Sequence, residues 1–244
     1  MNMKTFETIT LILPAYNEAA RIVNTINEAV SYFEKRHLNY EIIVAADGAD
    51  GTRELVNHMS QSNSQLKAIG SVERRGKGYG IRQAVAIACG DIVGFADADN
   101  KTPISELDKF FPHFANGAMV VIGSRGQRES VIERRQPWFR QIGSKGFAVY
   151  MHLIVGLWDI VDTQCGFKLF RADAARDLFS RQVIDGYMFD VEILYLARKL
   201  GYQIKQIPVR WRDDGDSRLD LVAGNIRNAF DILKIRFHSY GFKS

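Results

Sequence analysis

Short apolar runs alternate with amphipathic stretches through the first half of the chain. Five runs have the length and composition of buried strands, namely Ile9–Leu13, Glu41–Ala46, Leu66–Gly70, Ile92–Ala96 and Met119–Gly123. Between them, apolar residues recur at helical spacing over Ala19–Lys35, Arg53–Met59, Tyr79–Cys89 and Ser105–Phe114. This order predicts βαβ units, and therefore an α/β fold in which helices flank a mixed, mostly parallel sheet. Such sheets bind ligands at the carboxyl ends of their strands, so the loops after the strands are the first candidates for function.

The pattern changes after Gly123. Residues 124–136 are polar and strongly charged, whereas residues 147–158 are apolar with a single histidine. Downstream we predict a strand over Phe167–Phe170, helices over Ala172–Ser180 and Asp190–Lys199, a strand over Gln203–Arg210 and an amphipathic helix over Leu221–Phe237. Because no linker or repeat separates the two parts, we expect a single domain over residues 1–244, with one half over 1–123 and the other over 124–244.

The composition is that of an ordinary globular domain. Of the 244 residues, 46% are hydrophobic and 25% are charged, which excludes collagen-like, disordered and coiled-coil proteins. The 32 basic and 28 acidic residues leave a net charge of +4. This charge favours an anionic partner but is too small to indicate nucleic acid. Two cysteines exclude a disulfide scaffold and a four-cysteine zinc site.

Neither a membrane span nor a secretory signal is predicted. No stretch reaches the ~18 apolar residues that a span needs. Residues 1–10 carry Lys4 and Glu7 in place of the apolar core of a signal peptide. We therefore expect a cytoplasmic protein.

The loops after the first two predicted strands carry polar residues that have two interpretations. The first strand runs into Pro14-Ala15-Tyr16-Asn17-Glu18, where we expect Pro14 to end the strand and Glu18 to open the next helix. The second strand runs into Asp47 and Gly48, where a carboxylate can accept the imino N–H of a base. A plain strand-to-helix turn explains the first loop equally, and an Asx turn explains the second.

A loop rich in cations and glycines precedes the third predicted helix. Residues 73–80 read Glu-Arg-Arg-Gly-Lys-Gly-Tyr-Gly. Exposed backbone N–H groups and fixed positive charge at the start of a helix favour an anion such as a phosphate. The loop lacks the spacing of a Walker A motif, and it does not follow the first strand as a Rossmann fingerprint does. A solvated basic loop is the alternative.

The strongest local signal follows the fourth predicted strand, which runs into Asp97-Ala98-Asp99. In extended backbone, residues two apart face the same side, so both carboxylates would point to one place. Two negative charges at such a short distance favour a cation between them, and Mg²⁺ or Mn²⁺ is the natural occupant. A merely polar strand end is the alternative. The five histidines show no metal-ligand spacing, and no base adjoins Cys165.

Together and in this order, these motifs resemble glycosyltransferase family 2, whose members have the GT-A fold. The matching segments are LILPAYNEAARI, EIIVAADGADGT, RRGKGYGIRQAV, GDIVGFADADNKTP, VIGSRG, VDTQCGFKLFRADAA and GYMFDVEILYLARKLGY, over roughly residues 9–211. Within the family, DTQCGFKLF followed by FDVEILYLA most resembles the dolichyl-phosphate β-glucosyltransferases, with the dolichol-phosphate mannose synthases next.

The resemblance implies a role for each matching residue. Residues 1–123 would bind the nucleotide-sugar. Around the base and ribose would lie Pro14, Ala15, Tyr16 and Glu18, with Asp47 at the base edge. Lys77 with Arg75 would lie near the nucleotide or its diphosphate, and Asp97 with Asp99 would bind the ribose and the metal. Residues 124–244 would form the acceptor side, where Ser124, Arg125, Gln164 and Lys168 would face the acceptor or the transferred sugar, and Asp190 with Glu192 would place an acid near the sugar.

The implied activity is metal-dependent transfer of a hexose, with inversion, to a polyprenyl or dolichyl phosphate. Glucose from UDP-glucose is the favoured donor group. A phosphate acceptor is largely dianionic at pH 7 and needs no strong base. The alternatives are a GDP-mannose donor, or a soluble or glycan hydroxyl acceptor for which Asp190 would be the base. A sugar nucleotidyltransferase and a non-catalytic binding protein are the rival classes.

Two predicted helices combine aromatic and basic residues in a way that suits a membrane surface. In the first, Phe147, Met151, Ile154 and Trp158 recur at helical spacing with Tyr150 beside them, after Arg134, Arg135, Arg140 and Lys145. In the second, Phe230, Leu233 and Phe237 accompany Lys234 and Arg236. This pattern predicts a peripheral protein on the cytoplasmic face of a membrane. Packing on the core or in a homodimer is the alternative.

Overall fold

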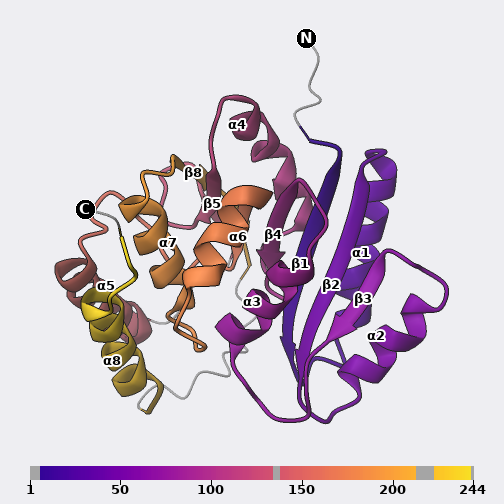
Figure 1. The fold of residues 1–244 in the computed structure, drawn as a ribbon, viewed down its shortest axis with the longest axis horizontal. Coiled ribbons are helices and arrows are strands. Elements are labelled where there is room, and N and C mark those ends of the chain that lie inside the picture. Colours follow the sequence, from indigo (N-terminus) through magenta and orange to yellow (C-terminus); the bar gives the residue numbers. More distant parts are fainter. Residues whose placement is uncertain (1–5, 134–137, 213–222, 243–244) are drawn as a thin grey trace.

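The computed structural model describes residues 6–133, 138–212 and 223–242. Its centre is a seven-stranded sheet in the order β3-β2-β1-β4-β7-β5-β8 (Figure 1). The strands are β1 (Thr8–Tyr16), β2 (Asn39–Asp47), β3 (Leu66–Ile69), β4 (Ile92–Ala96), β5 (Val120–Ser124), β7 (Phe167–Arg171) and β8 (Ile204–Pro208). Only β7 runs antiparallel to its neighbours, β4 and β5. The predicted mixed, mostly parallel sheet is therefore confirmed. Two short strands, β6 (Val131–Ile132) and β9 (Arg210–Trp211), pair in a separate parallel sheet.

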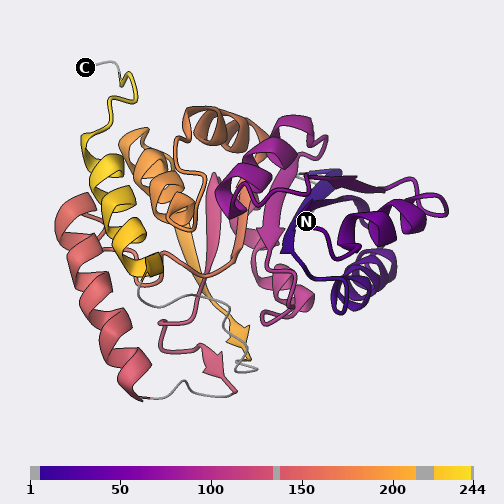
Figure 2. The same cartoon turned by 90° about the horizontal axis from the view of Figure 1, so that it is seen from below.

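Helices cover both faces of the sheet (Figures 1 and 2). One face carries α3 (Lys77–Ile87), α6 (Ala172–Arg181) and α7 (Phe189–Lys199). The other face carries α1 (Ile22–Lys35), α2 (Thr52–Ser60), the 3-10 helix η1 (Ile104–Lys109) and α4 (Phe111–Ala115). Two further helices, α5 (Trp138–Val155) and α8 (Ala223–Phe237), lie side by side at the edge of the molecule next to α7.

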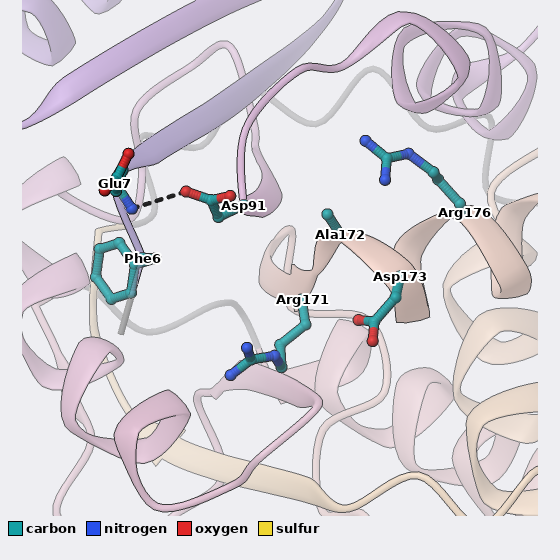
Figure 3. A pocket seen from close by; sticks show the side chains of 7 residues that line it. All are labelled: Phe6, Glu7, Asp91, Arg171, Ala172, Asp173 and Arg176. Carbon is teal, nitrogen blue, oxygen red and sulfur yellow. Dashed lines mark hydrogen bonds between the residues drawn. The ribbon is translucent and has the colours of Figure 1, made fainter. Parts of the chain in front are cut away.

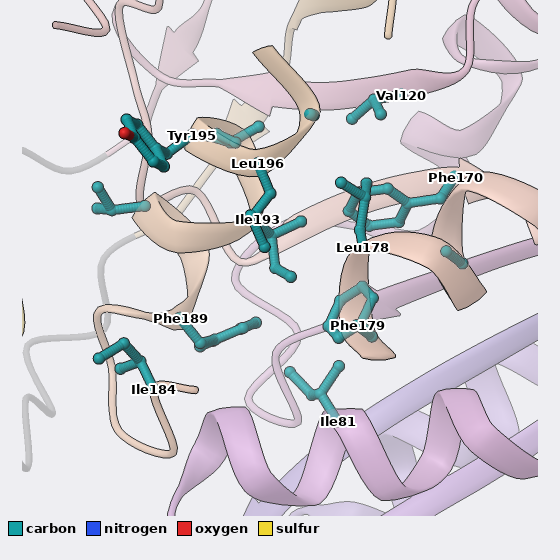
Figure 4. Close-up of a cluster of buried hydrophobic side chains, with 14 of the residues drawn as sticks. Ile81, Val120, Phe170, Leu178, Phe179, Ile184, Phe189, Ile193, Tyr195 and Leu196 are labelled. Atoms are coloured by element: carbon teal, nitrogen blue, oxygen red, sulfur yellow. The ribbon is translucent and has the colours of Figure 1, made fainter. Parts of the chain in front are cut away.

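The alternation of side chains along the strands builds a core on each face. On the α3 side, Phe170 of β7 packs edge-on against Phe179 of α6, with Ile81 of α3 and Phe189 of α7 in the same cluster (Figure 4). On the α1 side, neighbouring strand positions such as Leu11, Ile42 and Leu169 pack against α1, α2 and α4. Both clusters draw on the central strands, so the strand ends that carry the site are held from both faces.

The first strand and first helix differ from the sequence prediction. Pro14 does not end β1, which continues in register with β2 as far as Tyr16. β4 pairs with β1 only up to Ile12, so a proline two residues further on removes no hydrogen bond on that side. Glu18 does not open α1 either. Its carbonyl accepts the N–H groups of Arg21 and Ile22 in a turn before the helix.

Two other predicted elements are divided by proline. The helix predicted over Ser105–Phe114 is η1 followed by α4, because Pro112 lacks an N–H group and cannot continue a helix from the preceding turn. The strand predicted over Gln203–Arg210 is likewise divided into β8, which ends at Pro208, and β9. The remaining elements of the first half lie where the apolar pattern predicts them.

Within α5, the stripe predicted for a membrane surface faces the core, because Met151 is buried and Phe147, Tyr150 and Ile154 are partly buried. Trp158, the last residue of the stripe, lies beyond α5 and is 61% exposed, so both interpretations stay predictions. Arg134 and Arg135 lie outside the described residues, as do the side chains of Arg140 and Lys145. Over the described ranges, no helix has both the length and the apolar character to span a membrane.

Candidate functional site

A lysine and an aspartate meet at the carboxyl end of β4. Lys77 is the first residue of α3, and Asp97 directly follows β4. The Nζ of Lys77 donates to Oδ1 of Asp97 over 2.7 Å. The Lys77 ammonium also lies 6.0 Å from the ring centre of Phe95 and 5.7 Å from that of Phe189, within the range of cation–π attraction. The cation-rich loop and the paired acids are therefore brought together as predicted.

The electrostatics of this pair keep the lysine charged. Burial lowers the pKa of Lys77, but the charges of Asp97 and Asp190 and the hydrogen bond to Asp97 outweigh burial and raise the net pKa above its ordinary value. The lysine side chain is 18% exposed and that of Asp97 is 43% exposed. A fixed positive charge thus stands beside an accessible carboxylate.

Gly166 shapes the position of Asp97. A Cβ at residue 166 would lie 2.0 Å from Oδ2 of Asp97, and the Asp97 N–H donates to the Gly166 carbonyl over 3.1 Å. The carboxylate therefore packs directly over the glycine backbone, and any side chain there would displace it. In the sequence, Gly166 is one position of the matching segment VDTQCGFKLFRADAA, and nothing local indicates its contact with Asp97. Its role depends on a contact between β4 and the chain before β7.

Asp99 lies close enough to Asp97 for the two charges to interact, although not for the predicted reason. Residues 98 and 99 form a turn rather than extended backbone. Burial, followed by the negative charge of Asp97, raises the pKa of Asp99, against the opposing charge of Lys101. Lys101 Nζ lies 3.2 Å from Oδ2 of Asp99. Two repelling carboxylates on one turn fit a divalent cation, which Mg²⁺ sites hold with one or two carboxylates while phosphates and waters complete the shell.

A second lysine–aspartate pair is enclosed beside the first. Lys168 of β7 donates from Nζ to Oδ1 of Asp190 and to the carbonyl of Cys165, both over 2.6 Å. Lys168 is fully buried and Asp190 is nearly so. Burial raises the pKa of Asp190, while the charges of Lys168 and Lys77 oppose that rise. The Lys168 ammonium thus contacts two buried oxygens, and its predicted contact with an acceptor stays a prediction.

Glu192 does not join Asp190 at the site. Residues two apart on a helix point to nearly opposite sides, and α7 directs Glu192 into the core. Its carboxylate accepts the N–H groups of Val183 and Ile184, over 2.8 and 2.9 Å, and the hydroxyl of Tyr240 over 2.8 Å. Burial raises the pKa of Glu192, and these three hydrogen bonds oppose the rise. The predicted contact of Glu192 with the sugar is therefore wrong.

The loop after β2 and the cation-rich loop are tied together by Asp47. Its Oδ2 accepts the N–H of Arg75 over 2.7 Å, and its Oδ1 accepts that of Ser71 over 3.3 Å. Backbone N–H groups thus contact both carboxylate oxygens of Asp47. Its recognition of a base edge stays a prediction. Arg75 itself stacks on Tyr79, with its guanidinium carbon 4.7 Å from the ring centre.

The segment after β1 contributes a ring to the same edge. Arg74 lies over Tyr16, with its guanidinium carbon 4.3 Å from the ring centre. Tyr16 pairs in register with Asp47, which places it at the carboxyl end of the sheet, while Ala15 is buried and the Glu18 N–H donates to Thr52. Tyr16 thus lies beside the cation-rich loop, and the contacts of Pro14, Ala15, Tyr16 and Glu18 with a nucleotide stay predictions.

On the acceptor side, Arg125 is held by a residue that sequence analysis did not select. Its Nε and one terminal nitrogen donate to the two oxygens of Asp162, over 2.7 and 2.9 Å, and its guanidinium carbon lies 5.4 Å from the Trp211 ring centre. Asp162 opens the quoted DTQCGFK segment, but only the fold brings it to Arg125. Ser124 is fully buried, whereas Gln164 is exposed.

A hollow of about 400 Å³ lies at the other end of the sheet. It is lined by Phe6, Glu7, Asp91, Arg171, Ala172, Asp173 and Arg176 (Figure 3). Asp91 precedes β4 and accepts the Glu7 N–H over 2.7 Å, so this hollow is at the amino end of the strand whose carboxyl end carries Asp97. It contains none of the predicted site residues. Among the described residues, no cluster of three or more histidine, cysteine, aspartate or glutamate side chains could hold a metal ion.

Comparison with known proteins agrees with this geometry. The sequence model of Glycosyl transferase family 2 matches residues 10–179. A Trichomonas vaginalis protein named dolichyl-phosphate beta-glucosyltransferase ALG5C is 32% identical over 240 residues, covering 94% of this chain and 71% of that protein. The Homo sapiens dolichyl-phosphate beta-glucosyltransferase is 32% identical over 244 residues, covering 93% and 74%.

A similarity to solved structures supports the fold. Glucosyl-3-phosphoglycerate synthase from Mycobacterium tuberculosis, crystallised with Mn²⁺, UDP and glucosyl-3-phosphoglycerate, superposes with a TM-score of 0.69 at 21% identity, covering 96% of this chain and 81% of that one. The match to the family model, residues 10–179, includes the cation-rich loop, Asp97 and Asp99. This chain therefore belongs to glycosyltransferase family 2 and is a glycosyltransferase.

Proposed function

We propose that the protein transfers glucose from UDP-glucose to dolichyl phosphate or a similar polyprenyl phosphate. The relatives named above supply the sugar and the acceptor of the proposal. The structural feature that carries it is the Lys77–Asp97 pair, in which a charged ammonium contacts a carboxylate that is 43% exposed. Such a cation is placed to contact the diphosphate of a donor at the carboxyl end of the sheet.

A divalent cation, Mg²⁺ or Mn²⁺, is part of the proposal. Asp97 and Asp99 would hold it, and it would supply positive charge to the departing nucleoside diphosphate. The fit rests on the mutual repulsion of the two carboxylates, which raises the pKa of Asp99 after the effect of burial. Asp97 is accessible, and Gly166 leaves its carboxylate room to lie at the strand end.

The reaction would be a single displacement with inversion. An oxygen of the acceptor phosphate forms a bond to the anomeric carbon of glucose, while the bond from that carbon to the UDP oxygen breaks and UDP leaves with the electron pair. No proton has to be removed, because the acceptor phosphate is largely dianionic at pH 7. Asp190, the predicted base for a hydroxyl acceptor, is buried against Lys168. This enclosure favours an acceptor that arrives already ionised.

The acceptor side offers a matching charge. Arg125 lies next to the site, because Asp162, which holds its guanidinium, is on the same segment as Gly166, and the backbone of Gly166 packs against the Asp97 carboxylate. We place the acceptor phosphate near Arg125, with Ser124 and Gln164 as neighbours. The Asp162 pair orients the guanidinium plane, which suits a planar, forked contact with a phosphate.

The proposal includes binding to a membrane surface on its cytoplasmic side. Val149 and Leu153 of α5 and Ile226, Phe230 and Phe237 of α8 are between 52% and 79% exposed. Lys234 and Arg236 of α8 are exposed as well, and basic, aromatic-rich helices favour anionic lipid surfaces. Flotation with vesicles that contain anionic lipid tests this surface. Phe230→Ser with Phe237→Ser should abolish co-flotation, and unchanged flotation would exclude α8 as the contact.

A donor and acceptor screen tests the activity. The purified protein would be incubated with radiolabelled UDP-glucose or GDP-mannose, with and without dolichyl phosphate in vesicles, and with Mg²⁺, Mn²⁺ or a chelator. We expect label to enter the organic phase from UDP-glucose only, to require dolichyl phosphate, and to stop in the chelator. Label from GDP-mannose alone would overturn the sugar assignment. Turnover in the chelator would overturn the metal assignment.

A further inference from the structure

The buried carboxylate of Glu192 is linked to the cation-rich loop through a chain of contacts. Glu192 accepts the N–H groups of Val183 and Ile184, so it fixes the start of the segment 182–188 that connects α6 to α7. Glu192 is itself fixed by the hydroxyl of Tyr240, which comes from the chain after α8. Within the part of the chain that the structure describes, neither residue forms a hydrogen bond or ion pair with Lys77 or Asp97, so any effect on the site must pass through this segment.

The segment 182–188 supports the cation-rich loop directly. The carbonyl of Asp185 accepts the N–H of Tyr79 over 3.1 Å. Gly76 has a φ of +117°, and a Cβ there would lie 2.3 Å from the Asp185 carbonyl oxygen. Within the first turn of α3, a Cβ at Gly78 would lie 2.6 Å from the carbonyl oxygen of Ile184. Lys77 lies between these two glycines, so the backbone that carries its ammonium rests on the segment that Glu192 holds.

Side chains reinforce the same contact. Arg82 of α3 pairs with Asp185 over 2.7 Å and donates to the Gln182 carbonyl over 3.3 Å. From the other side, Lys234 of α8 donates to the Val183 carbonyl over 3.4 Å. The first turn of α3 is therefore joined to α8 and Tyr240 through one short segment that packs against both.

We propose that Glu192, anchored by Tyr240, is a positioning residue that sets the cation-rich loop for donor binding. The proposal rests on the donor role of Lys77 given above. The position of the Lys77 ammonium depends on the first turn of α3. That turn packs on the carbonyls of Ile184 and Asp185. The segment that carries these carbonyls is held by the carboxylate of Glu192. Loss of the Tyr240 hydroxyl loosens this chain without touching the site.

The test compares two tyrosines that each donate to a carboxylate over 2.8 Å. Tyr240→Phe removes the bond to Glu192, and Tyr32→Phe removes the bond to Asp108, which lies on the opposite face of the sheet and outside the chain of contacts. Glu192→Gln is the stronger variant, because an amide nitrogen cannot accept the N–H group that a carboxylate oxygen accepts. For each protein we would measure unfolding by urea, the Kd for UDP, and KM and kcat for UDP-glucose.

We expect the Kd and the donor KM to rise about threefold in Tyr240→Phe and about tenfold in Glu192→Gln, each tenfold step being 1.4 kcal/mol. The kcat at saturating donor should stay within about twofold, and Tyr32→Phe should leave all three constants unchanged even if it unfolds more easily. Equal effects of the two tyrosine variants, or unchanged UDP binding in Glu192→Gln, would overturn the proposal.

Hydrogen exchange separates failure of this proposal from failure of the proposed function. The Tyr79 amide donates to the Asp185 carbonyl in this structure, so Tyr240→Phe should speed exchange in the peptide that covers residues 76–80, measured without donor. Tyr32→Phe should not. If the wild-type protein bound no UDP, the donor role would be lost while this readout still reported on the link. Unchanged exchange at residues 76–80 would contradict the link itself.

Discussion

Two lysine–aspartate pairs lie side by side in this protein, and their surroundings differ. In the Lys77–Asp97 pair, the side chains are 18% and 43% exposed, whereas in the Lys168–Asp190 pair they are 0% and 5% exposed. The N–O distances are nearly equal, at 2.7 and 2.6 Å. Chemistry and distance are thus matched between the pairs, and accessibility is what separates them.

The difference indicates different roles. An accessible pair can exchange partners, so Lys77 and Asp97 are available to a diphosphate and a cation. An enclosed pair cannot do so, because either charge left without its partner in the interior is costly. Lys168 and Asp190 instead hold β7 and the start of α7 together beneath the open pair. Three predictions sharpen this comparison.

The largest expected effect is on stability, at the enclosed pair. Lys168→Met removes an ammonium of 0% exposure and leaves the Asp190 carboxylate buried without its partner. Breaking a buried pair in this way costs about 3–5 kcal/mol. Lys77→Met should cost no more than about 1 kcal/mol, because solvent reaches the carboxylate it leaves. Urea unfolding measures both values, and equal losses would contradict the division into open and enclosed pairs.

The second effect is on turnover, at the open pair. Lys77→Met should lower kcat for glucosyl transfer roughly 100-fold, the loss typical of removing one preorganised charge or donor at a developing negative charge. Lys67→Met is a matched control, because Lys67 also pairs with an acid, Glu41, over 2.6 Å but on β3. The control should keep its kcat. A Lys77→Met protein that turned over at the wild-type rate would remove the lysine from the mechanism.

The open pair was predictable from the sequence, and the enclosed pair was not. Lys77 and Asp97 each follow a local signal, a glycine-rich basic loop and a strand end, and the α/β pattern brings strand ends together. Lys168 lies in a strand, where the sequence gives no sign that its ammonium turns into the core toward α7. Its partner is 22 residues away and on a different element. Long-range pairing of this kind requires the fold.

The same limit explains the error over Glu192 and the two interpretations of α5. The resemblance placed Glu192 with Asp190 near the sugar, but the helix separates them. In α5 the aromatic stripe fitted a lipid surface and a packed core equally well, and the fold turns most of it toward the core and the neighbouring α8. The Tyr150 hydroxyl donates to the Ala229 carbonyl of α8 over 3.2 Å. Periodicity identified the helix, whereas its buried face depended on a partner more than 70 residues away.

The smallest effect concerns a third pair, Arg125–Asp162, whose carboxylate is 11% exposed, between the 5% of Asp190 and the 43% of Asp97. Burial raises the pKa of Asp162, but its hydrogen bonds and charge contact with Arg125 outweigh burial and hold the pKa below its usual value. A carboxyl whose folded-state pKa is lowered stabilises the protein above its unfolded-state pKa of about 3.9, and this contribution is lost as the pH falls through the folded-state pKa.

At any pH between 5 and 7, the unfolding free energy of Asp162→Asn should therefore be about 2 kcal/mol lower than that of the wild type, as expected for the loss of hydrogen bonds to a charged group. Below pH 4 the difference from the wild type should shrink, because the wild-type carboxyl takes up a proton and the pair is lost there too. Urea titrations at a series of pH values measure this difference. A gap that widened toward low pH would mean that Asp162 is held protonated in the folded protein, and the Arg125 guanidinium would then lack the fixed counter-charge that orients it toward an acceptor phosphate.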